Sequence, residues 1–196
     1  SIGLVDIDGG YLKPLFEITP LQTHSDWAWI PGITWGADNR SLYYVNHAPS
    51  ANLLNPEVSP NFGLGANSLE TNTNVNLIEQ TGMFAFPSAS PLRPSGKEKI
   101  FQIAYLQAIF PAQSETSRYR MVVMDRDGSN RRFIFPPEDA PGIDPQKPVW
   151  APDPVEGQTG DFIAVVYQGN LWLVDSGNEQ AYQITGDGLI NRIDWK

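Results

Sequence analysis

Two acidic stretches are the first candidates for chemistry, because carboxylates two residues apart can bind a divalent cation. They are Asp6-Ile7-Asp8-Gly9 and Asp125-Arg126-Asp127-Gly128. A calcium-binding loop of this kind needs further oxygen ligands spread over twelve residues. Each stretch here instead joins two predicted strands, and the Asp-Gly pair is a strong turn signal. We therefore interpret both stretches as hairpin turns, and we predict neither a metal site nor a cofactor.

Histidine and serine chemistry is restricted by composition. His24 and His47 are the only histidines, so a three-histidine metal site is excluded and any Ser-His-Asp triad has to use one of them. Neither histidine stands in a motif, and we expect both in loops. Ser88 and Ser90 lie in a Pro-rich stretch that lacks the strand-to-helix elbow of a hydrolase nucleophile. The sequence therefore predicts no serine-hydrolase site.

Other polar groupings have ordinary structural interpretations. The carboxylate pairs Glu156 with Asp161 and Glu138 with Asp139 are expected in solvated loops, although such pairs can serve acid-base catalysis. Gly63-Leu64-Gly65 is expected to be a flexible loop, because no helix follows it to complete a phosphate-binding site. No catalytic constellation is visible, and we predict that this chain is not itself an enzyme.

Charge and composition exclude further classes of function. The 196 residues contain 22 acidic and 13 basic side chains, for a formal net charge of −9. Such a surface repels a phosphate backbone, so we do not expect nucleic acid as a partner. The absence of cysteine excludes disulfides and thiolate chemistry. No apolar run approaches the roughly 20 residues needed to span a bilayer, and we predict no transmembrane segment.

An internal repeat organises the rest of the chain. Apolar strands that end in Asp and a Gly-containing turn occur at Ile2–Gly9, Met121–Gly128 and Leu171–Gly177, with Asp125 and Asp175 lying 50 residues apart. Further strands are expected to end in an aromatic residue, at Trp35, Phe86, Trp150 and Trp195. A period of about 40–50 residues is typical of propellers and solenoids.

The strands group naturally into four-stranded antiparallel blades whose strands we name A to D in chain order. We predict an all-β chain and a β-propeller, since a lone four-stranded sheet must bury both faces against neighbours. The single segment 1–196 then divides into a half-blade 1–19, blades 27–79, 83–136 and 148–185, and strand A of the next blade at 190–196. Trp35, Trp150 and Trp195 are expected in equivalent buried positions. Asp38 and Asp153 are expected to accept backbone N–H groups in the A–B turns.

At these residues the chain resembles the TolB-type propeller family, whose repeats carry a Trp-Ser-Pro-Asp-Gly-like signature after strand A. Trp150-Ala151-Pro152-Asp153 is similar to it, Trp35-Gly36-Ala37-Asp38-Asn39 less so, and the blade at Phe86 departs from it with the insert Pro87 to Gly96. The resemblance implies a WD-repeat-like scaffold that is extracytoplasmic or periplasmic. Because strand B is missing between the terminal pieces, we predict a fragment of a propeller with six or more blades.

Two functions from different classes remain. The first is a non-enzymatic scaffold that binds a protein or peptide through the loops of one face. The second is a gating or substrate-positioning propeller of a larger hydrolase of the serine peptidase type, whose catalytic domain lies outside this sequence. A sugar lyase is disfavoured, because it needs a histidine-rich metal site near the axis.

Loop length indicates which face binds. Strand alternation places the B–C and D–A connections on one face, and these include the long segments 20–32, 48–66, 107–117 and 136–147. Long connections within a compact domain are frequently functional. They also contain bulky apolar residues that either pack on the blades or meet a partner. The residues expected to bind are His24, Asp26, Trp27, Trp29, Ile109 and Phe110.

Overall fold

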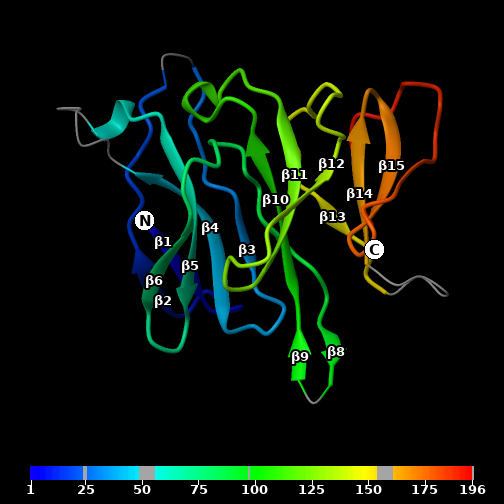
Figure 1. Ribbon diagram of the computed structural model, residues 1–196. Coiled ribbons are helices and arrows are strands. Elements are labelled where there is room, and N and C mark those ends of the chain that lie inside the picture. The colour runs from blue at the N-terminus through cyan, green and yellow to red at the C-terminus, as the bar shows by residue number, and fades with distance from the viewer. Residues whose placement is uncertain (24–25, 49–55, 97, 154–160, 196) are drawn as a thin grey trace.

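The computed structural model describes residues 1–23, 26–48, 56–96, 98–153 and 161–195. Within these ranges the chain is built of strands and two short 3-10 turns, η1 (Pro56–Val58) and η2 (Pro111–Gln113), with no α-helix. Figure 1 shows the sheets side by side, from the N-terminal strands on the left to the C-terminal strands on the right. The prediction of an all-β chain is confirmed.

Three four-stranded antiparallel sheets form the body of the protein, and in each the strands lie in chain order. The first sheet contains β3 (Ile33–Trp35), β4 (Ser41–Ala48), β5 (Asn61–Ser68) and β6 (Thr73–Ile78). The second contains β7 (Ser88–Ala89), β10 (Gln102–Ala108), β11 (Tyr119–Asp125) and β12 (Arg132–Phe135). The third contains β13 (Val149–Trp150), β14 (Phe162–Tyr167), β15 (Asn170–Asp175) and β16 (Ala181–Gln183). The prediction of four-stranded antiparallel units is therefore confirmed.

Two hairpins accompany the sheets. Strands β1 (Ile2–Val5) and β2 (Leu12–Phe16) pair with each other before the first sheet. Strands β8 (Arg93–Ser95) and β9 (Glu98–Ile100) form an insert between β7 and β10. This second hairpin projects from one end of the sheets, whereas η1 and η2 lie at the opposite end (Figure 1). We call these the hairpin end and the loop end.

The Asp-Gly stretches make the predicted turns. The amide of Gly9 donates to the carbonyl of Asp6 at 2.8 Å, and that of Gly128 donates to the carbonyl of Asp125 at 2.9 Å. Both glycines have φ above +70°, which glycine adopts without steric cost. The side chain of Asp127 accepts hydrogen bonds from Ser129, which lower the pKa of that carboxyl. These aspartates therefore shape turns, as the sequence predicted.

The second sheet is buried on both faces. Ile103 and Tyr105 on β10 pack toward the first sheet, in a cluster that includes Leu64. Their neighbours Ala104 and Leu106 pack toward the third sheet, in a cluster with Ile163, Val165 and Trp150. Consecutive apolar residues along β10 are explained by this arrangement, because a strand between two neighbouring sheets has no solvent face.

The short inner strands of the three sheets are adjacent, with β7 lying between β3 and β13. Trp150 on β13 is 6% exposed, and its indole Nε1 donates to the backbone carbonyl of Ser88 on β7 at 2.9 Å. Trp35 on β3 is 50% exposed. Trp195 is half-buried and belongs to none of the described strands. The prediction of equal burial is therefore wrong.

The reason lies in what precedes each tryptophan. Trp150 has the inner strand β7 of the preceding sheet against its ring. The β1–β2 hairpin precedes the first sheet, and it contacts β4 of that sheet, where Phe16 packs on Tyr44 with ring centroids 4.2 Å apart. No inner strand of a preceding sheet covers Trp35 within the described residues.

The inner strand of the second sheet also differs from the expectation. Phe86 was predicted to end this strand, but it precedes β7 and has φ of +43°. Ala89 pairs with Ile103 at the place where Trp150 pairs with Ile163 in the third sheet. The residue equivalent to the tryptophans is thus Ala89. The following Ser90-Pro91, which parallels Ala151-Pro152, was the overlooked sequence signal.

Three segments expected in loops or turns are ordered parts of the sheets. His47 lies near the end of β4 and is 1% exposed. Gly63-Leu64-Gly65 lies in β5, and a Cβ on Gly65 would be 2.8 Å from Cζ of Tyr44. Glycine therefore permits close packing in a strand at this position rather than loop flexibility. Ser88 is buried in β7 and Ser90 is buried immediately after it.

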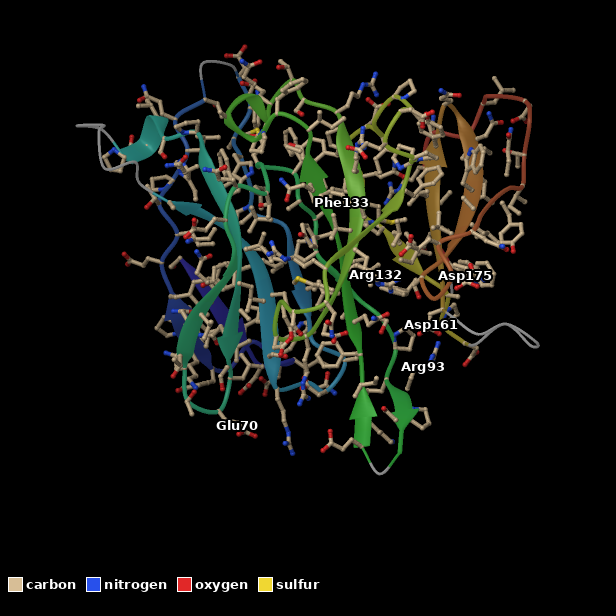
Figure 2. The ribbon with its side chains drawn as sticks, viewed as in Figure 1. Glu70, Arg93, Arg132, Phe133, Asp161 and Asp175 are labelled. Carbon is tan, nitrogen blue, oxygen red and sulfur yellow. The ribbon has the colours of Figure 1, made fainter. Side chains whose placement is uncertain are left out.

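Asp161 does not lie on a solvated surface, so the expectation for this residue is wrong. Its Oδ1 lies 2.7 Å from Nε of Arg93, and the two side chains are only 14% and 22% exposed. Figure 2 shows the two residues facing each other between the β8–β9 insert and the third sheet. Its proposed partner Glu156 lies outside the described residues. Glu138 and Asp139 are exposed, as expected.

Segment 190–196 is predicted to be a strand, but its described part, 190–195, forms none. The amide of Ile190 donates to the carbonyl of Gly169 at 2.7 Å, which holds the start of the segment against the β14–β15 turn. A strand is defined by hydrogen bonding to a partner strand, and none of the described strands pairs with this segment.

Candidate functional site

A groove at the loop end, which includes the predicted residue Trp27 in its lining, is a candidate binding site. It has a volume of about 270 Å³ and lies among the segment that follows β2, the η1–β5 connection and η2. Its apolar lining includes Leu21, Trp27, Val58 and Met83, and its polar lining includes Gln113 and Glu115. We call it the loop-end groove.

The two predicted tryptophans have different roles. Trp29 is half-buried, and its Nε1 donates to the backbone carbonyl of Met83 at 3.1 Å. Its ring packs edge-to-face on Phe62, with centroids 5.2 Å apart. Trp27 lines the groove and contacts Phe84 with ring centroids 6.3 Å apart. Trp29 therefore fastens the segment to the first sheet, while Trp27 contributes a surface to the groove.

The other predicted residues do not join Trp27 in one site. Ile109 is 36% exposed and lines a separate hollow of about 720 Å³, whose wall includes Phe133 and Glu179. Phe110 is 64% exposed and immediately precedes η2. Asp26 is exposed beside Trp27, and His24 lies outside the described residues. Of the predicted set, Trp27 thus lines one hollow and Ile109 another, and the other described members line neither of the two.

His47 is a structural residue of the loop end that sequence reasoning missed. Its Nδ1 lies 3.0 Å from the carbonyl of Thr19, and its Nε2 lies 2.8 Å from the carbonyl of Ser59. The ring stacks on Phe62 with centroids 4.8 Å apart. His47 therefore connects the segment after β2 with the η1–β5 connection, and Ser59 itself lines the groove. Its place within a run of strand-forming residues was the available signal.

Tyr119 supports the η2 side of the groove. Its hydroxyl donates to the carbonyl of Ser114 at 2.7 Å and accepts from the amide of Phe84 at 3.4 Å. Burial raises the pKa of Tyr119 to about 12, so the hydroxyl keeps its proton at neutral pH. Ser114 lines the groove. The groove is therefore held by buried side chains of β4 and β11 rather than by its own loops alone.

His47 is occupied by backbone contacts, and the described residues contain no cluster suited to a metal ion. Both ring nitrogens of His47 face backbone carbonyls, so neither contacts a serine hydroxyl. No group of three or more His, Cys, Asp or Glu side chains is placed to hold a metal ion in the described ranges. In the same ranges no helix has the length and apolar character needed to cross a bilayer.

Comparison with known proteins adds no further assignment. No protein-family model matches the sequence, and no curated protein matches it significantly.

Proposed function

We propose that this chain is part of a β-propeller that binds a protein or peptide segment at its loop end. Three sheets of identical strand order, stacked through continuous apolar clusters and with adjacent inner strands, support the propeller arrangement. Such repetition, in which each sheet buries both faces against its neighbours, is the principle of propeller architecture. The TolB-type resemblance and an extracytoplasmic location belong to the same proposal.

Exposed apolar residues support the presence of further blades. Trp35 is half-exposed where its equivalent Trp150 is buried. On the β1–β2 hairpin, the paired residues Val5 and Leu12 are 64% and 69% exposed. Another sheet placed against this hairpin and β3 would cover these side chains, as the second sheet covers the third. We therefore propose a complete propeller of at least six blades.

The loop-end groove carries the binding proposal. Trp27 and Met83 belong to its apolar lining, and Gln22 and Gln113 belong to its polar lining. Aromatic anchors in water-excluding hollows are typical of interface hot spots. A gating propeller of a larger hydrolase is the second candidate, which the same groove would serve by positioning a peptide substrate.

The test is a selection of peptides from a random displayed library on the folded chain. Binding of each selected peptide is then measured by fluorescence anisotropy to the wild type, Trp27→Ala and Trp35→Ala. We expect Trp27→Ala to weaken binding at least tenfold, because it removes the main apolar contact. Trp35→Ala is the matched control at the opposite end and should leave binding unchanged. The proposal would be refuted if both variants lost the same amount of affinity for the selected peptides, or if the library yielded no binding peptide.

A further inference from the structure

The Asp, Glu, Lys and Arg residues of the segments that supply the loop-end groove are all acidic. Glu115 lines the groove, Asp26 is adjacent in sequence to Trp27, and Glu57 is adjacent to Val58. All three are exposed. None of the 13 Lys and Arg residues of the protein falls within segments 20–32, 48–66 or 107–117, which supply most of the groove.

The nearest basic residue along the chain does not neutralise this surface. Arg118 follows directly after segment 107–117, and its guanidinium forms an ion pair with Asp144. Elsewhere Glu70, Asp161 and Glu179 also have arginine partners. In the described structure neither Glu115 nor Asp26 forms an ion pair with a Lys or Arg side chain.

From these observations we infer that the loop-end groove binds an extended peptide segment in which apolar residues are flanked by Lys or Arg. This inference rests on the proposed binding function and adds the chemistry of the partner. The apolar side chain lies against Trp27, and the flanking cations lie near the exposed carboxylates of Glu115 and Asp26. Complementary charges of this kind raise the association rate and discriminate against acidic partners.

The expected electrostatic effect is moderate and sensitive to salt. Exposed ion pairs contribute little individually, and removal of one should change the dissociation constant about 2- to 5-fold. Several flanking charges acting together produce a larger difference. The Debye length falls from about 10 Å at 0.1 M salt to about 3 Å at 1 M, so the preference should decrease as salt is added.

Three fluorescein-labelled synthetic peptides test the inference. They share the core Leu-Phe-Leu and carry two Lys, two Gln or two Glu on each side. Anisotropy titrations at 0.05 M and 0.5 M NaCl are performed with the wild type and with Trp27→Ala. Glu115→Lys alters the groove, and Glu98→Lys makes the same change of net charge on the exposed β9 strand at the hairpin end.

We expect the Lys-flanked peptide to bind at least fivefold more tightly than the Gln-flanked peptide at low salt, and the Glu-flanked peptide to bind most weakly. Glu115→Lys should reduce this preference, Glu98→Lys should preserve it, and 0.5 M NaCl should weaken it. Equal or tighter binding of the Gln- or Glu-flanked peptide at low salt would overturn the inference. Trp27-dependent binding without a preference for Lys would leave the proposed function standing, whereas absence of Trp27-dependent binding for all peptides would contradict both.

Discussion

Replacement of Trp150 tests whether neighbouring sheets are joined through their inner strands. The side chain is 6% exposed within the apolar cluster between the second and third sheets. Trp150→Ala empties this volume, and large-to-small changes of buried aromatics cost about 3–5 kcal/mol. Trp150→Phe keeps most of the packing but leaves the buried carbonyl of Ser88 without its indole donor. We expect that change to cost about 1–3 kcal/mol.

Trp35 provides an internal comparison, because it occupies the equivalent strand position but is half-exposed. Full burial of a large apolar side chain is worth about 1.5–3 kcal/mol, so Trp35→Ala should lower the free energy of unfolding by only about 1 kcal/mol. The two alanine variants should therefore differ by at least 2 kcal/mol, although the sequence suggests equal effects.

Urea unfolding followed by far-UV circular dichroism measures these differences without relying on the fluorescence of the removed indoles. The transition midpoint should fall while the m-value stays constant, since the surface exposed on unfolding changes little. A loss at Trp35 equal to or greater than that at Trp150 would refute the reasoning, as it would mean that the first sheet has a covered inner strand.

Three further changes examine other contacts. Arg93→Ala should lower the free energy of unfolding, measured by thermal or urea unfolding, by about 2 kcal/mol. This is less than the 3–5 kcal/mol for a fully buried pair, because Asp161 retains some exposure. A loss below about 0.5 kcal/mol would contradict a structural role for the ion pair. His47→Leu should cost about 2 kcal/mol, because the buried carbonyl of Ser59 and the part-buried carbonyl of Thr19 lose their ring contacts. Limited proteolysis should then cleave segment 20–32 faster than in the wild type, and unchanged cleavage would argue against the link. Tyr119 has a folded pKa of about 12, above the unfolded value of about 10, so its contribution to stability is complete below pH 10 and is lost as the pH rises toward 12. In Tyr119→Phe the decline of unfolding free energy over that interval should be shallower by about 1.4 kcal/mol per pH unit, and an identical decline in both proteins would exclude this titration.

The grouping of strands could be predicted from sequence because it depends on local chemistry. Asp125 and Gly128 make a turn through contacts within four residues, and Asp38 caps the β3–β4 turn by accepting from the amide of Arg40 at 3.0 Å. Apolar runs such as β10 indicate burial on both faces wherever they occur. The four-stranded sheets could therefore be recognised without tertiary information. The sequence also indicated the loop end as a candidate binding face and Trp27 as a residue to test there.

The tertiary structure decided which individual side chains are buried and which hydrogen-bond or ion-pair partners they have. Trp35 and Trp150 have similar sequence surroundings, yet only Trp150 has a preceding inner strand over its ring. His47 looks like an unremarkable polar residue until segments 28 and 12 residues away place carbonyls at both of its ring nitrogens. Asp161 is half-buried and has an ion-pair partner because Arg93, 68 residues earlier, reaches it from an inserted hairpin. Local sequence determines which turn or strand forms, whereas solvent exposure and hydrogen-bond partners depend on distant segments whose approach is set by the stacking of whole sheets.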